Sequence, residues 1–220
     1  MGRTFRVSVV GGTGAEGKGL ATRLARAGHT VFIGSRDLLR ASATAREIQS
    51  MSPEATVQGM DNRSAVRASE ICILTVPYAA QRATVEGLRD ELQGKLLIDA
   101  TVPLVPPKVA RVQLPSSGSA VAQIQNLLGE GVRVVSAFQN VSAHALNDAD
   151  HEVECDVLVC GDDVEARSIV VELAAGIGLR GVHAGPIVNS AAAEALTSIL
   201  ISINMRYKIP GAGIRITGLP

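Results

Sequence analysis

Residues 9–17 read Val9-Val10-Gly11-Gly12-Thr13-Gly14-Ala15-Glu16-Gly17. The stretch follows an apolar run over 5–10 and opens an amphipathic run over 14–27, so its Gly-x-Gly-x-x-Gly spacing joins a predicted strand to a predicted helix. In that context the first glycine permits a tight turn, the second lets backbone approach a diphosphate, and the third lets the helix pack on the strand. N–H groups at the helix start attract phosphate oxygens. We predict a dinucleotide phosphate loop made of Gly12, Thr13, Gly14, Ala15, Glu16 and Gly17; the alternative is a plain tight turn.

Apolar and amphipathic runs alternate along the rest of the chain. Strands are predicted over 5–10, 30–33, 56–59, 71–76, 95–99, 132–138, 156–161 and 179–183, and helices over 14–27, 37–50, 80–92, 119–128, 164–177 and 189–207. Such alternation predicts parallel strands with helices on both faces, joined by right-handed crossovers. The expected fold class is α/β: a Rossmann-type doubly wound, mostly parallel sheet with a small C-terminal helical extension. Ligands of such sheets bind at the carboxyl ends of the strands.

Composition narrows the range of partners. The 220 residues are 46% hydrophobic and 2% aromatic, which suits a core of Val, Ile, Leu and Ala, and their formal net charge is zero. A neutral chain of this kind favours neither nucleic acid nor an anionic membrane surface. The apolar stretch 187–203 is interrupted by Asn189 and Glu194, so we expect a core or interface helix that does not span a membrane. Three cysteines in apolar runs are typical of buried thiols in a reducing compartment, and we expect a cytoplasmic protein.

The end of the second predicted strand indicates which dinucleotide binds. NAD-preferring sites carry a carboxylate there for the ribose 2′-hydroxyl, but this chain has Ser35 and Arg36, with Arg40 one helical turn further on. Arginine pairs with phosphate through a forked set of N–H groups, so these three residues suit the 2′-phosphate of NADP. An ordinary solvated helix start is the alternative. Asp37 lies directly before the helix and is expected to act as its N-cap.

Three further strand ends should gather at the same edge of the sheet. The cofactor-binding candidates there are Thr75, Val76 and Pro77 after the fourth strand, Thr101 and Val102 after the fifth, and Gln139 and Val141 after the sixth. Backbone groups at these positions could hold a nicotinamide amide, while the valines line its ring. Taken singly, each proline also fits a strand stop and each valine an ordinary core position.

No catalytic dyad or metal-ligand cluster is evident in the sequence. We therefore expect no catalytic side chain and no metal site. Hydride transfer between two stacked rings needs no protein nucleophile or base, because the protein contributes proximity and orientation. The expected division is an NADP-binding Rossmann domain over 1–150 and a smaller strand–helix part over 151–220 that completes the substrate pocket.

Several segments together resemble a known family. They are the glycine loop with Lys18-Gly19-Leu20, Gly34-Ser35-Arg36, Leu74-Thr75-Val76-Pro77, Val159-Cys160-Gly161-Asp162-Asp163, Ala184-Gly185-Pro186 with Asn189, Ser190 and Glu194, Arg206-Tyr207-Lys208, and Gly213-Ile214-Arg215-Ile216-Thr217-Gly218. The chain is similar over nearly its whole length to the NADPH-dependent reductases of coenzyme F420. This resemblance implies hydride transfer between NADP(H) and the deazaflavin coenzyme F420, with the deazaflavin touched by residues 139–141 and 211–214.

The resemblance also implies a homodimer or higher homo-oligomer in which the last helix contributes to the interface. Family members often carry histidine in the sixth-strand loop, where this chain has Gln139 and Asn140. Two alternatives therefore stay open. One is an NADPH-dependent reductase of another acceptor, flavin or ferric iron, and the other is an NADPH-sensing binding protein without turnover.

Overall fold

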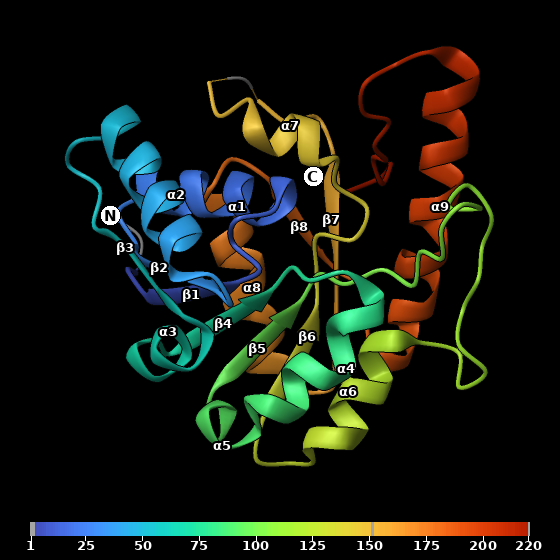
Figure 1. Ribbon diagram of the computed structural model, residues 1–220. Helices are drawn as coiled ribbons and strands as arrows, with labels where there is room; N and C mark the ends of the chain where they lie inside the picture. The colour runs from blue at the N-terminus through green and yellow to red at the C-terminus, as the bar shows by residue number, and fades with distance from the viewer. Residues whose placement is uncertain (1–2, 151, 220) are drawn as a thin grey trace.

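A computed structural model describes residues 3–150 and 152–219. Its strands are β1 (Arg6–Val10), β2 (Thr30–Ser35), β3 (Val57–Asp61), β4 (Ile71–Leu74), β5 (Leu96–Asp99), β6 (Arg133–Ser136), β7 (Asp156–Gly161) and β8 (Arg180–His183). Its α-helices are α1 (Ala15–Arg26), α2 (Leu38–Met51), α3 (Asn62–Ala68), α4 (Tyr78–Gly87), α5 (Arg89–Leu92), α6 (Ala120–Leu128), α7 (Ala143–Asn147), α8 (Val164–Gly176) and α9 (Ser190–Tyr207), the last preceded by a short 3₁₀ turn, Ile187–Asn189. Figure 1 shows these elements in one layered body.

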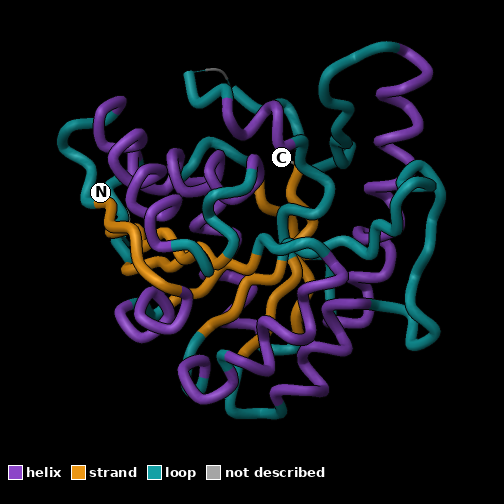
Figure 2. The backbone as a smooth tube through the Cα atoms, viewed as in Figure 1, coloured by secondary structure: helices purple, strands orange, loops and turns teal. Residues whose placement is uncertain are grey.

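The strands form one sheet in the order β3-β2-β1-β4-β5-β6-β7-β8. Neighbours from β3 through β6 are parallel, β7 is antiparallel to β6, and β8 is parallel to β7. The tube in Figure 2 shows the strands as a central layer between helices. The predicted Rossmann-type, mostly parallel sheet is confirmed. The reversal at β7 places the start of β7 at the edge where β1 to β6 end.

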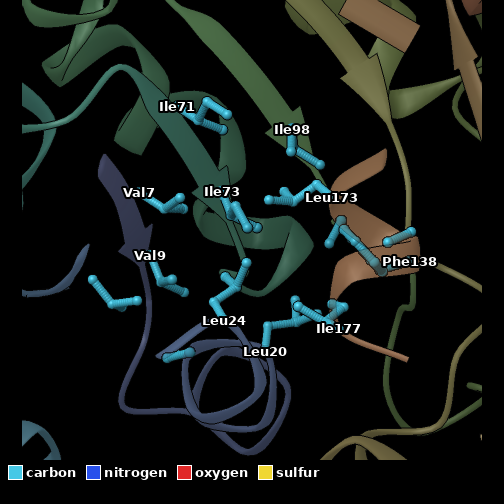
Figure 3. Close-up of a cluster of buried hydrophobic side chains, with 14 of the residues drawn as sticks. Val7, Val9, Leu20, Leu24, Ile71, Ile73, Ile98, Phe138, Leu173 and Ile177 are labelled. Atoms are coloured by element: carbon cyan, nitrogen blue, oxygen red, sulfur yellow. The ribbon is translucent and has the colours of Figure 1, made fainter. Parts of the chain in front are cut away.

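Residues on the central strands alternate between two cores. Val7, Val9 and Ile73 face one cluster with α1 and α8, whereas Val10 and Leu74 face the other with α4 and α6. Figure 3 shows part of the first cluster, where side chains of β1, α1, β4, β5 and α8 meet. Apolar runs on buried strands therefore serve two hydrophobic layers, which fixes the strand ends relative to both sets of helices.

Two short helices and one helix break were not predicted. α3 is capped by Asp61, whose carboxylate accepts from the Ser64 N–H, and α7 lies between the predicted strands over 132–138 and 156–161, where no helix was predicted. The guanidinium of Arg23 donates to carbonyls in and after α7, a contact that no local pattern reveals. The predicted helix over 80–92 instead divides into α4 and α5 at Leu88. All three cysteines are buried free thiols, as expected.

The last helix is only partly covered by the rest of the chain. The segment Ile187–Tyr207 has a mean hydropathy of 1.3 over its most apolar window, of which 33% is buried, so length and composition alone would let it cross a membrane. Core helices of soluble proteins pass the same test. Ala193, Glu194 and Leu200 are buried against the body, whereas Ile199 and Met205 are exposed.

Candidate active site

The glycine loop forms a tight turn between β1 and α1. The left-handed residue in that turn is Gly11, with φ +84°, and the Gly14 N–H donates to the Gly11 carbonyl. A Cβ on Gly11 would lie 2.8 Å from the Thr75 carbonyl oxygen. The tight turn, which we assigned to Gly12, thus requires Gly11 as well. Gly12 is needed for close packing, because its Cβ would lie 2.8 Å from the Val9 carbonyl oxygen.

The other two glycines play different parts. A Cβ on Gly17 would lie 2.5 Å from the Thr75 hydroxyl and 2.8 Å from the Gly11 carbonyl oxygen, so Gly17 lets α1 approach the sheet. Gly14 is exposed, and its Cβ would meet only the Gly11 carbonyl oxygen, at 3.4 Å. Gly14 is the N-cap of α1 and has no side chain to accept from the N–H groups at the start of the helix, so a ligand could accept from them instead.

A cavity of about 620 Å³ opens in front of this loop. That volume is in the range of cofactor sites. Its lining comes from the loop and from the ends of β2, β3 and β4, and comprises Gly11, Thr13, Gly14, Ser35, Arg36, Asp37, Arg40, Asn62, Thr75, Val76, Pro77, Ala80 and Thr84. The structure thus brings together the loop, the Ser35/Arg36/Arg40 group and the fourth-strand end. The predicted cofactor-binding residues that do not line it are Gly12, Ala15, Glu16, Gly17, Thr101, Val102, Gln139 and Val141.

The residues that follow β2 place two arginines at this cavity. Asp37 is the N-cap of α2: its carboxylate accepts from the Leu39 N–H at 2.9 Å and the Arg40 N–H at 3.1 Å, as expected. The Ser35 hydroxyl accepts from the Asp37 N–H. Arg36 and Arg40 are exposed, and neither has an ion pair with another residue in the described ranges 3–150 and 152–219. Two exposed guanidinium groups beside a phosphate loop fit a 2′-phosphate.

Asn62 is a cavity residue that the sequence analysis missed. It follows β3 as the first residue of α3, close to Gly34, whose Cβ would lie 3.0 Å from the Asn62 Oδ1. Because the third strand was predicted to end at residue 59 and α3 was not predicted, nothing placed Asn62 at the sheet edge. The helix α3 is the element that brings it there.

Asp99, also missed, organises the end of β5. Its buried carboxylate accepts from the Gln81 side-chain amide at 2.7 Å and the Thr101 N–H at 2.9 Å, and its carbonyl accepts from the Gln139 side chain at 2.6 Å. Burial raises the pKa of Asp99 to about 6, against the opposing effect of the hydrogen bonds from Thr101 and Gln81. In the sequence, a carboxylate directly after the apolar run 96–98 could have indicated a polar residue at a strand end. Asp99 thereby ties α4 and residues 139–141 to one strand end.

Two glutamates near this edge also have perturbed pKa values. Glu16 keeps some solvent exposure, yet burial of its carboxyl group raises its pKa to about 8, and the charge of Asp99 adds to the rise. With a pKa of about 8, Glu16 is mostly protonated at neutral pH and adds little negative charge beside the N–H groups at the start of α1. Burial also raises the pKa of Glu194, which caps α6 from α9 by accepting from the Ser119 hydroxyl and the Ala120 N–H.

The residues that follow β6, 139–143, border a second, smaller cavity. Phe138, fully buried, has φ +77° and turns the chain two residues after the end of β6. The side chain of Gln139 is turned inward toward Asp99, with 3% of its surface exposed. The cavity of about 210 Å³ is lined by the 139–143 loop, α9 and the tail, namely Gln139, Asn140, Val141, Ser142, Ala143, Thr197, Leu200, Ile201, Asn204 and Ala212. Gln139 and Val141 therefore belong to this cavity.

The chain is similar to known proteins over nearly its whole length. Residues 6–103 match the family model described as NADP oxidoreductase coenzyme F420-dependent. The F420-dependent NADP reductases of Methanocaldococcus jannaschii and Methanothermobacter thermautotrophicus are each 40% identical over 98% of this chain, covering 99% and 96% of their own lengths. A crystal structure from an Arthrobacter species has a TM-score of 0.81 at 23% identity, covering 97% of this chain and 99% of that chain, which supports the fold. Identity of this extent over nearly the full length shows that the chain belongs to the family of F420-dependent NADP reductases.

Proposed function

We propose that this protein is an oxidoreductase that transfers a hydride between NADP(H) and coenzyme F420. The observation that carries the proposal is the larger cavity, in which a phosphate-binding helix start faces Arg36 and Arg40. Family membership supports the pairing of NADP with F420. When bound, a nicotinamide supplies or accepts the hydride; the residues of this chain bind and orient it.

The residues fit NADP in several respects. The N–H groups at the start of α1 would hold the diphosphate, and Ser35, Arg36 and Arg40 the 2′-phosphate. Val76, at the end of β4, would lie along the nicotinamide ring, while Thr101, hydrogen-bonded to Asp99, would fix the neighbouring backbone. Such fixed positioning is the protein's contribution to hydride transfer, and it can lower the barrier by roughly 7–11 kcal/mol.

We place the second substrate at the smaller cavity. Residues 139–141 and the tail over 211–214 would contact the deazaflavin, and the part over 151–220 would complete its pocket. The exposed apolar side chains of α9, Ile199 and Met205 among them, support a homodimer or higher homo-oligomer built on this helix. We propose a cytoplasmic location, in keeping with three buried free thiols.

The test follows the visible absorbance of oxidised coenzyme F420 mixed with NADPH and the purified protein, with NADH as the control. Fast loss with NADPH and slow loss with NADH is the expected result. Tight NADPH binding without loss of absorbance would contradict the assignment of the acceptor. Flavin and ferric acceptors would then separate another reductase from a sensor without turnover.

A further inference from the structure

The C-terminal tail is fastened to the sheet edge by one buried carboxylate. Asp156, the first residue of β7, accepts from the Arg180 Nε and Nη2 at 2.7 Å each, and from the Ile216 N–H at 2.6 Å. The Arg180 Nη2 also donates to the Ile216 carbonyl at 3.0 Å, and the Asp156 N–H donates to the Ile214 carbonyl at 2.8 Å. Figure 1 shows the tail leaving α9 and returning to β7.

Close contacts of the residues just before Ile214 fix the same path of the tail. A Cβ on Gly211 would lie 2.7 Å from the Ser142 side chain, and one on Gly213 would lie 2.8 Å from Cys155. The Ala212 N–H donates to the Asn204 side chain at 2.6 Å. Residues 211–216 therefore lie against β7, α9 and the loop after β6 without room for a larger residue at either glycine.

The start of β7 is also hydrogen-bonded to the loop after β6. The Asn140 side chain donates to the Asp156 carbonyl at 2.6 Å and accepts from the Leu158 N–H at 3.3 Å. Asn140 and Ala212 both line the smaller cavity. Asp156 therefore connects the two segments that border this cavity, residues 139–143 on one side and the tail on the other.

We propose that the Asp156–Arg180 pair positions residues 211–216 as a wall of the deazaflavin pocket and so sets the affinity for the second substrate. This inference rests on the proposed function. Asp156 has 2% of its side chain exposed and Arg180 has 34%, so the carboxylate is the fixed member of the pair. Neither residue lines the NADP cavity, so cofactor binding should not depend on them. They are positioning residues, since they act through the tail.

The experiment compares Asp156→Asn with Arg180→Lys, which keeps the charge but not the fork. Arg133→Gln, which removes a partly exposed ion pair between β6 and Glu165 of α8, is the matched control. Losing one hydrogen bond to a charged group changes a binding constant by about tenfold. Asp156→Asn should therefore raise KM for F420 roughly tenfold. KM for NADPH should stay within about twofold, because the NADP cavity is untouched. Arg180→Lys should lie between the wild type and Asp156→Asn.

Hydrogen exchange of the amides over 212–216 gives an independent readout, and it should be faster in Asp156→Asn than in the control. Faster exchange with both KM values unchanged would refute the positioning role. A parallel rise in both KM values would also refute it, since it would indicate general loss of structure. If the wild type does not reduce F420 with NADPH, the proposed function itself is wrong. Unchanged exchange in Asp156→Asn would then refute the anchor separately.

Discussion

Replacing Arg36 and Arg40 by alanine should remove the preference for NADPH. Both side chains line the cavity beside the Ser35 hydroxyl and are free of ion pairs within the described part of the chain. A hydrogen bond to a charged group contributes about 1.5–3 kcal/mol, and exposure places these near the lower end. Since 1.4 kcal/mol is a factor of ten, each substitution should weaken NADPH binding about tenfold. The double variant should lose less than the product, because both groups serve one phosphate.

The assay is the dissociation constant of NADPH and of NADH, measured by calorimetry for each variant. Binding of NADH, which lacks the 2′-phosphate, should change little. Arg46→Ala is the matched control, since Arg46 is exposed on α2, the helix that carries Arg40, but does not line the cavity. Equal weakening of NADPH by Arg46→Ala would mean that only the general positive field matters. Equal losses for NADPH and NADH in Arg36→Ala and Arg40→Ala would show that these residues do not read the phosphate.

Three further outcomes are expected. Gly17→Ala should reduce NADPH affinity and lower the free energy of unfolding by about 1–3 kcal/mol, because its Cβ would lie 2.5 Å from the Thr75 hydroxyl. Gly176→Ala is the control and should change neither quantity, because its Cβ would meet nothing within 4 Å. Denaturant unfolding followed by circular dichroism measures the free energies. Folding raises the pKa of Glu16, so its contribution to stability is present below about pH 4.5 and is lost as the pH rises through about 8. The fall in the free energy of unfolding between pH 6 and pH 9, measured by denaturation, should therefore be smaller for Glu16→Gln than for the wild type. Glu194→Gln should cost about 1–3 kcal/mol of unfolding free energy at pH 7, because an amide nitrogen cannot accept from the Ala120 N–H, and an unchanged denaturation midpoint would contradict this role in capping α6.

Local patterns predicted the strands and the phosphate loop because each depends on residues adjacent in sequence. The apolar runs of β1 and β4 had to be buried on both faces, and the glycines had to turn and pack as they do. What was missed depends on distant partners. α7 is held by Arg23, more than a hundred residues away, and Asp99 gains its role from Gln81 and Gln139. Spacing in one sequence carries no record of such contacts.

The conformation of Phe138 links the loop over 139–143, the proposed acceptor-binding loop, to the protein interior. A non-glycine residue at φ +77° is strained by about 1 kcal/mol or more, and here the burial of its ring in the same cluster as Leu173 holds it there. The direction of the loop over 139–143 therefore depends on packing in this cluster, to which Val141 of the loop also belongs. A substitution that opens a space deep in that cluster should therefore alter the backbone at Phe138 and, under the proposed function, the affinity for the acceptor. Under the proposed function, the position of the acceptor therefore depends in part on a buried ring that no substrate touches.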